Sequence, residues 1–243
     1  KNGDSFVSWN WKANGGTTSS NSDGSITSTV QANTTAGFSI VTYTGTGSNA
    51  TIGHGLSVAP EFIVPKNRDA TGNWYVYTGD GTKSLLLNST AAIFSTADKW
   101  NNTAATSSVF SIGTEANLNG NGQKHVAYCF HSVEGYSKIG KYNGNGNADG
   151  TFVHLGFRPA FFMTKRTDTT ANWVSVDTAQ NPFNVTDAGI QMNTNIAQGT
   201  GYANDFLSNG MKIRNSGATV NASGGTYIYM AFAEAPFKYA NAR

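Results

Sequence analysis

The chain has 243 residues and a formal net charge of +2, and only 12% of its residues are charged, about half of the average share. Its longest basic run is the pair at 165–166, which excludes a phosphate-neutralising surface for nucleic acid. Its longest apolar stretch, residues 227–233, is too short to cross a bilayer. The length predicts two domains. The single cysteine, Cys129, rules out a disulfide framework and is expected to be a small buried strand residue.

The first 36 residues contain one apolar run followed by a polar segment. The run FVSWNW at 6–11 matches HVAYCF at 125–130 and YIYMAF at 227–232. We therefore expect residues 1–13 to be the end strand of an upstream repeat. Residues 14–36 are rich in Ser, Thr, Gly and Asn, a composition typical of a flexible linker. Within them, residues 25–30 alternate and could form a short strand.

The rest of the chain contains an internal repeat. Residues 60–74 align without gaps onto residues 159–173, and seven of the fifteen positions are identical. This predicts one repeat at 37–133 and a second at 134–243. The joint between them, residues 131–134, is short enough to fix their relative orientation.

Each repeat contains about seven short alternating or apolar runs. In the first repeat the expected strands are 38–44, 50–56, 61–66, 73–78, 84–88, 107–113 and 124–131. In the second they are 136–142, 151–157, 160–166, 172–177, 189–193, 205–214 and 225–233. Short strands at about ten-residue spacing predict an all-β protein with two tandem antiparallel β-sandwich domains of jelly-roll or lectin-like type. Trp74 and Trp173 begin their strands and are expected to anchor the two cores.

One loop has the spacing of a calcium site. Asn145, Asn147 and Asp149 place oxygen atoms two residues apart before a glycine, as at the start of a Ca²⁺ loop. The twelfth position of that pattern is Gly156 instead of a bidentate Glu. The alternative is a hairpin turn rich in Asn and Gly.

Several aromatic residues are candidates for stacking on sugar rings. They are Tyr75, Tyr77, Trp100 and Tyr202, with Trp9 and Trp11. The alternative for each is packing in the core or on a strand surface.

Catalytic and zinc motifs are missing from the sequence. Asp69 and Asp168 repeat exactly, but they fall in the turn before each Trp strand, where a carboxylate accepts hydrogen bonds from the backbone. His54 and His154 belong to different repeats and lack partners at ligand spacing. No G-x-S-x-G elbow or phosphate loop occurs. We therefore expect no enzymatic activity.

Five segments resemble a repeated β domain of marine bacteriophage and cyanophage virion proteins. These segments are GFSIVTYTGTGSNATIGHGL, PEFIVPKNRDATGNW, HVAYCFHSVEGYSKIG, DFLSNGMKIR and the ending GGTYIYMAFAEAPFKYANAR. The resemblance implies a virion or extracellular location as a tail-fibre, capsid-fibre or decoration protein used in assembly or host attachment. Its partners would be other virion proteins and further copies of itself. It implies no catalytic residues. The alternative function is a carbohydrate-binding, lectin-like module of a phage fibre or a bacterial adhesin, with a host-surface glycan as its ligand.

Overall fold

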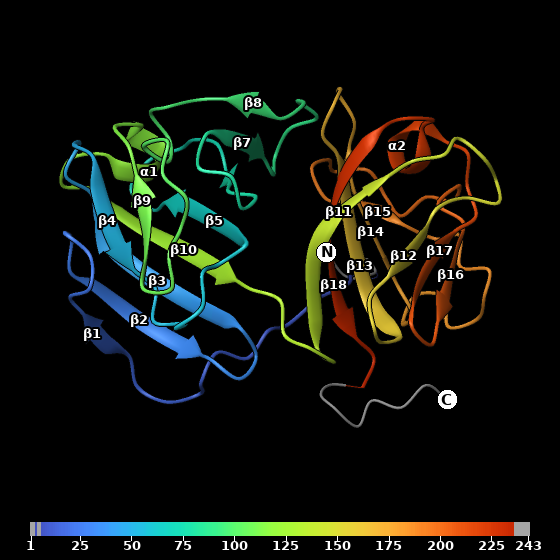
Figure 1. The fold of residues 1–243 in the computed structure, drawn as a ribbon, viewed down its shortest axis with the longest axis horizontal. Coiled ribbons are helices and arrows are strands. Elements are labelled where there is room, and N and C mark those ends of the chain that lie inside the picture. The colour runs from blue at the N-terminus through green and yellow to red at the C-terminus, as the bar shows by residue number, and fades with distance from the viewer. Residues whose placement is uncertain (1–2, 4–5, 236–243) are drawn as a thin grey trace.

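The structure is a computed structural model that describes residue 3 and residues 6–235. The protein is all-β, and within the described residues the named strands pair antiparallel. Two helices of four residues each, α1 (Ala116–Asn119) and α2 (Ala218–Asn221), complete the secondary structure of the described residues. Figure 1 shows the elements up to β10 on one side of the molecule and those from β11 on the other.

The first half of the chain is built around a five-stranded sheet with the order β1-β2-β3-β10-β5. Its strands are β1 (Ser19–Asn21), β2 (Ser28–Asn33), β3 (Phe38–Thr44), β10 (Lys124–Phe130) and β5 (Phe62–Asn67). Two smaller sheets accompany it. They consist of β4 (Ala50–Gly53) with β9 (Val109–Ile112), and of β6 (Tyr75–Val76), β7 (Lys83–Leu86) and β8 (Phe94–Ser95).

The second half contains a five-stranded sheet with the order β11-β18-β13-β14-β15. Its strands are β11 (Ser137–Asn143), β18 (Thr226–Ala233), β13 (Pro159–Arg166), β14 (Trp173–Asp177) and β15 (Ile190–Gln191). A three-stranded sheet has the order β12-β17-β16. It contains β12 (Phe152–His154), β17 (Gly210–Ile213) and β16 (Asn204–Leu207).

The two halves repeat the same pairing pattern. The strand order β3-β10-β5 in the first half corresponds to β11-β18-β13 in the second, and the β4–β9 pair corresponds to β12–β17. A short helix precedes the last strand in both halves. The hydroxyl of Tyr43 donates to the carbonyl of Leu118 in α1 at 2.7 Å, and that of Tyr142 donates to Val220 in α2 at 2.8 Å. The sequence repeat is therefore a repeat of topology and of hydrogen bonding.

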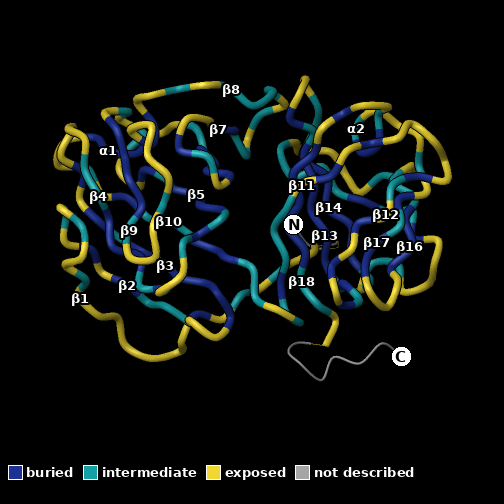
Figure 2. The backbone as a smooth tube through the Cα atoms, viewed as in Figure 1, coloured by how far each residue is buried: buried dark blue, intermediate teal, exposed yellow. Residues whose placement is uncertain are grey.

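Alternation along the central strands decides which residues enter which core, because neighbouring side chains point to opposite faces of a sheet. One face of the first sheet contributes Val41, Tyr43 and Ala127 to a cluster formed only by the first half. A second cluster, with Tyr142 and Phe162, is formed only by the second half. The tube in Figure 2 is accordingly darkest along these central strands.

A third apolar cluster joins the two halves across the other faces of these sheets. Its buried members are Ala13, Phe38, Phe62, Val64, Val76, Leu85, Phe130, Phe161, Met163, Trp173, Ile228 and Met230. Polar bonds reinforce it, since the indole of Trp173 donates to the carbonyl of Leu86 at 2.8 Å. The amide of Ile93 donates to the carbonyl of Thr167 at 2.9 Å. The central strands of each main sheet therefore contribute to an apolar cluster on each of their two faces.

Turn glycines set the start of the first main strand in both halves. Gly37 before β3 has a φ of 65° and Gly135 before β11 a φ of 71°. This left-handed conformation favours glycine. A Cβ atom at Gly37 would also lie only 2.7 Å from the carbonyl oxygen of His131. Glycine therefore satisfies both the turn and the close approach of the end of β10.

Several expectations need correction. Residues 14–36 are not a linker throughout, because β1 and β2 extend the first sheet by pairing with β3. Residues 6–13 form no strand. They lie between the halves, since Trp11 contacts Phe130 of the first half and Phe161 of the second. The expected strand 205–214 is two strands, β16 and β17, joined by a tight turn.

The tryptophans were expected to anchor the two separate cores, and this is also wrong. Trp173 is buried in the shared cluster, and the half-buried Trp74 packs against the same cluster. Trp173 is the first residue of β14, and Trp74 directly precedes β6. The final residues of the resemblance, FKYANAR, lie outside the described residues.

Candidate functional site

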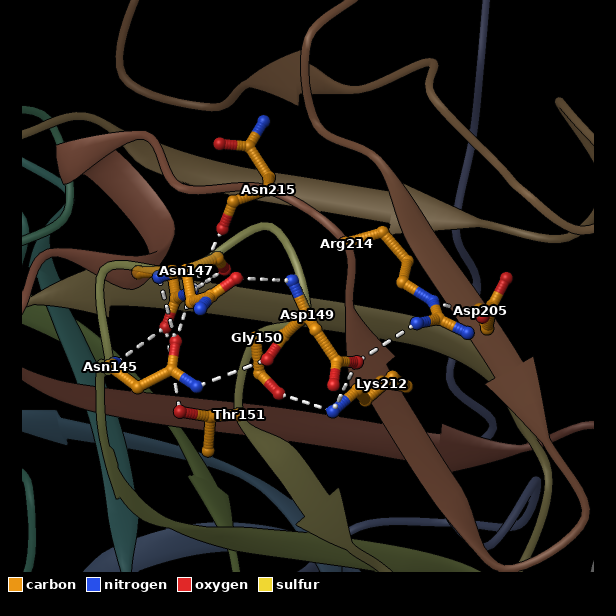
Figure 3. Close-up of polar contacts among 10 residues, drawn as sticks. Asn145, Asn147, Asp149, Gly150, Thr151, Asp205, Lys212, Arg214 and Asn215 are labelled. Atoms are coloured by element: carbon orange, nitrogen blue, oxygen red, sulfur yellow. Dashed lines mark hydrogen bonds and ion pairs between the residues drawn. The ribbon is translucent and has the colours of Figure 1, made fainter.

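The predicted calcium loop is the turn between β11 and β12, and its side chains form hydrogen bonds within the loop (Figure 3). The side-chain oxygen of Asn145 accepts from the amide of Asn147 at 3.0 Å, and that of Asn147 accepts from the amide of Asp149 at 2.9 Å. These are the turns that Asn and Asp side chains commonly form with the backbone two residues later. The oxygen atoms are therefore already engaged in shaping the turn.

The centre of this loop is occupied by the side chain of Asn221, the last residue of α2. Its amide nitrogen lies 2.9 Å from the side-chain oxygen of Asn145, 2.9 Å from the carbonyl oxygen of Asn147 and 2.8 Å from that of Asn215. Its own oxygen accepts from the amide of Asn145 at 2.9 Å. Asn221 is fully buried. An amide group thus stands where three oxygen atoms converge, in the position that a cation would take.

The same arrangement occurs in the first half, around the fully buried Asn119 of α1. Its amide nitrogen donates to the carbonyl oxygens of Ser48 at 2.6 Å and Gly113 at 2.8 Å. Its oxygen accepts from the amide of Thr46 at 2.8 Å. The first half has no Asn-x-Asn-x-Asp sequence at this turn, so the buried asparagine is the common feature. Sequence reasoning missed it, although Leu118-Asn119 and Val220-Asn221 occupy equivalent positions before the last strands.

Asp149 points away from this centre towards two cationic side chains. Its carboxylate lies 3.0 Å from the ammonium of Lys212 and 3.0 Å from the guanidinium of Arg214. Arg214 also pairs with Asp205 at 2.6 Å. The hydrogen bond from Lys212 and the two positive charges lower the pKa of Asp149. The carboxylate is paired with protein cations, and among the described residues no cluster of three or more His, Cys, Asp or Glu side chains could hold a metal ion.

Three of the aromatic residues predicted to stack on sugars are buried in the first core. Trp100 is fully buried, and Tyr75 and Tyr77 are 7% and 2% exposed. The hydroxyl of Tyr77 accepts from the amide of Ala105 at 2.9 Å, and its ring packs edge-on against Trp100. Lys99 lies 5.2 Å from the centre of the Tyr75 ring. Their faces are not available to a sugar, because all three side chains are packed in the first-half cluster.

The other aromatic candidates are only half-buried. The hydroxyl of Tyr202 accepts from the side-chain amide of Gln191 at 2.9 Å. Trp9 packs against Phe161, with ring centres 5.4 Å apart, and its indole donates to Asp177 at 3.3 Å. Trp11 packs against the same phenylalanine. These residues come from separate places, and only the two tryptophans are brought together.

The repeated aspartates make the backbone hydrogen bonds predicted for them. A carboxylate oxygen of Asp69 accepts from the amide of Lys124 at 2.7 Å, and one of Asp168 accepts from the amide of Thr226 at 3.0 Å. Each carboxylate therefore caps the first residue of the last strand in its own half. Asp168 also pairs with Arg166 at 2.7 Å. That guanidinium holds the pKa of Asp168 well below its usual value.

The paired histidines and the cysteine have different environments. His54 is fully buried and its ring contacts the carbonyl of Thr106 at 3.1 Å, whereas His154 is exposed. Burial lowers the pKa of His54. The prediction that Cys129 is a buried strand residue is confirmed, and burial raises the pKa of its thiol to about 12. A thiol with so high a pKa is a poor nucleophile at neutral pH.

Comparison with known protein families gives a match over almost the whole chain. A family model described as a domain of unknown function (DUF7483) matches residues 1–236. No curated protein and no solved structure matches the chain. Within the described part of the chain, none of the helices has the length and apolar character needed to cross a membrane.

Proposed function

We propose that this chain, which belongs to the DUF7483 family, is a non-catalytic structural module of a virion surface appendage. In this proposal its two halves are tandem β-sandwich modules that act as one stiff unit. The module would serve in particle assembly or in attachment to a host surface, as part of a fibre or decoration protein. Its location would be the virion or the extracellular space.

The observation that carries the proposal is the apolar cluster shared by the two halves. Twelve buried apolar residues from both halves form it. Interfaces between domains of one chain are commonly more polar, and domains joined in that way move relative to each other. A large apolar contact instead resists bending, which suits a protein that transmits force or fixes spacing on a particle.

The use of polar residues in the repeat supports a structural function. Asn119 and Asn221 hold equivalent turns, and Asp69 and Asp168 cap equivalent strands. These side chains recur because the fold needs them twice. The sandwich interpretation is supported by the smaller sheets, β4–β9 and β12-β17-β16, whose residues Ile52 and Phe206 enter the same clusters as the main sheets.

The proposal is tested on density-gradient-purified particles of a phage whose genome encodes the chain. Mass spectrometry should detect the chain at a stoichiometry fixed relative to the major capsid protein, and gold-labelled antibody should mark the particle surface. Finding the protein in the infected cell but never on the particle would refute the proposal.

The isolated chain provides a second test. Light scattering after size-exclusion chromatography should detect self-association, or binding to a particle protein, through an interface above about 1,000 Å². A strictly monomeric chain that ignores the particle and is retained on a glycan array would favour the carbohydrate-binding alternative. In that case Tyr202→Ala should reduce glycan retention, and Tyr77→Phe, which keeps the buried ring, should not.

A further inference from the structure

The shared cluster lines a partly open cavity of about 350 Å³ between the two main sheets. The residues that line it are Trp11, Phe38, Ile40, Phe62, Val64, Trp74, Leu87, Tyr128, Phe130, Phe161, Met163, Met192 and Met230. None of these side chains is charged. Pockets of this size that lie between domains and are lined by apolar and aromatic groups are typical ligand sites.

The wall that the first sheet contributes to the cavity changes in character along the strands. Antiparallel pairing places its inward-facing residues in three rows across β3, β10 and β5. The rows are Phe38–Phe130–Phe62, then Ile40–Tyr128–Val64, then Thr42–Val126–Lys66. The first row is buried, and all three members of the last row are half-buried. The wall therefore changes from aromatic and buried to polar and partly exposed over the length of the strands.

The aromatic end of the cavity is closed by rings from both halves. Phe130 stacks on Phe38, with ring centres 4.6 Å apart. Trp11 contacts Phe130 at 6.1 Å and Phe232 at 5.4 Å between ring centres. The lining is less buried away from this end, where Ile40 and Tyr128 of the second row are half-buried, and we therefore infer that the cavity opens on the side of Lys66.

Lys66, in the half-buried third row, provides a cation on this side of the cavity. It follows Phe62 and Val64 on the same face of β5, and its ammonium lies 5.9 Å from the centre of the Trp74 ring. The ammonium donates to the carbonyls of Asn67 at 2.8 Å and Ala70 at 3.2 Å. An ammonium carries three protons, so one proton is left for a further acceptor. No carboxylate in the described part of the chain forms an ion pair with it.

We propose that this cavity binds a straight-chain carboxylic acid, with the hydrocarbon chain between the sheets and the carboxylate at Lys66. A peptide segment does not fit, because its backbone N–H and C=O groups would find almost no partners on this lining and would be costly to bury. An acyl chain has no polar group along its length. Three flexible side chains, Met163, Met192 and Met230, adapt readily to such a chain.

The volume sets the length of the ligand. A dry apolar cavity of about 150 Å³ accommodates the six carbons of benzene, so a cavity of this volume holds about 12 to 14 carbons. Dodecanoate is therefore the test ligand. Its methyl end would reach the aromatic row, and its carboxylate would remain at the half-exposed row with Lys66.

Isothermal titration of the full chain with octanoate, decanoate, dodecanoate and hexadecanoate tests the proposal. Each added methylene should tighten the Kd by about fourfold until the cavity is filled, and hexadecanoate should gain little over dodecanoate. A chain that binds none of these acids, or binds all four equally, would overturn the proposal. Dimerisation that excludes dodecanoate would assign the cavity to a second copy and would overturn it as well.

Two variants separate the hydrocarbon site from the head-group site. Lys66→Met should weaken dodecanoate binding about tenfold, as expected for loss of a charged hydrogen bond, and should leave dodecanol binding unchanged. Lys141→Met, at an exposed lysine outside the lining, is the matched control. Val64→Phe should weaken both ligands by filling the cavity, and Ile40→Phe, at a half-buried position, replaces it if Val64→Phe does not fold. Unchanged dodecanoate binding in Lys66→Met and in the filled cavity would refute the site.

Discussion

Asn221→Ala tests whether a buried amide holds the loop between β11 and β12. The substitution removes two amide protons that are shared among three oxygen atoms at 2.8–2.9 Å, and one oxygen that accepts from the amide of Asn145. Each lost hydrogen bond costs about 1 kcal/mol, and more where its partner stays buried and unsatisfied. We expect the free energy of unfolding to fall by about 3 kcal/mol.

The equivalent substitution in the other half makes this prediction more stringent. Asn119→Ala removes the same kind of contacts, to the carbonyl oxygens of Ser48 and Gly113 and the amide of Thr46. Its effect should match that of Asn221→Ala to within about 1 kcal/mol, because both substitutions remove a comparable set of buried hydrogen bonds. Asn195→Ala, at an exposed loop position, is the control and should change stability by less than about 0.5 kcal/mol.

Urea unfolding followed by far-UV circular dichroism measures these differences. Amide hydrogen exchange should also show faster exchange at residues 145–149 in Asn221→Ala, because their hydrogen bonds form the turn. A loss below about 1 kcal/mol in both variants, with unchanged exchange, would refute the idea that these asparagines hold the turns.

Three further predictions concern charge and metal. Burial lowers the pKa of the fully buried Lys165 from 10.5 to about 8, so between these pH values the folded chain has lost a proton that the unfolded chain keeps. The free energy of unfolding of the wild type should therefore rise relative to that of Lys165→Met by up to about 3 kcal/mol from pH 8 to pH 10.5, and a constant difference in urea unfolding would contradict this. Because the Asn221 amide occupies the centre of the Asn145–Asp149 loop, 5 mM Ca²⁺ should leave the Tm unchanged relative to EDTA, whereas a rise of several degrees would restore the metal hypothesis. Asp168→Asn should cost about 1 kcal/mol at pH 7, discounted for its exposure. Because Arg166 holds the pKa of Asp168 well below its unfolded value, this loss should shrink progressively as the pH falls below about 4; thermal unfolding across that range measures it, and an equal loss at all pH values would argue against the ion pair.

The sequence alone determined those features of the protein that depend on local pattern. Alternating runs such as 38–44 and 124–131 correspond closely to β3 and β10, because period-two alternation reflects a strand with one face in a core. The constant offset between Asp69 and Asp168 predicted equivalent turns, and both carboxylates cap equivalent strands. The amides that they cap, those of Lys124 and Thr226, lie 55 and 58 residues further along the chain, and only the fold identifies them.

Only the tertiary structure decided what depends on contacts between distant segments. The composition of residues 14–36 indicates a linker, yet β2 pairs with β3 because an open sheet edge lies beside it. Asn145, Asn147 and Asp149 have the spacing of a cation loop, but Asn221 reaches their centre from 76 residues away along the chain. Trp74 and Trp173 were assigned to separate cores, and packing of the two halves placed them at a shared apolar cluster instead. The spacing of residues along one strand cannot reveal which distant segment will cover its outer face. In this protein, that segment decides whether the residues of the face lie in a core, at the contact between the two halves or in the wall of the cavity.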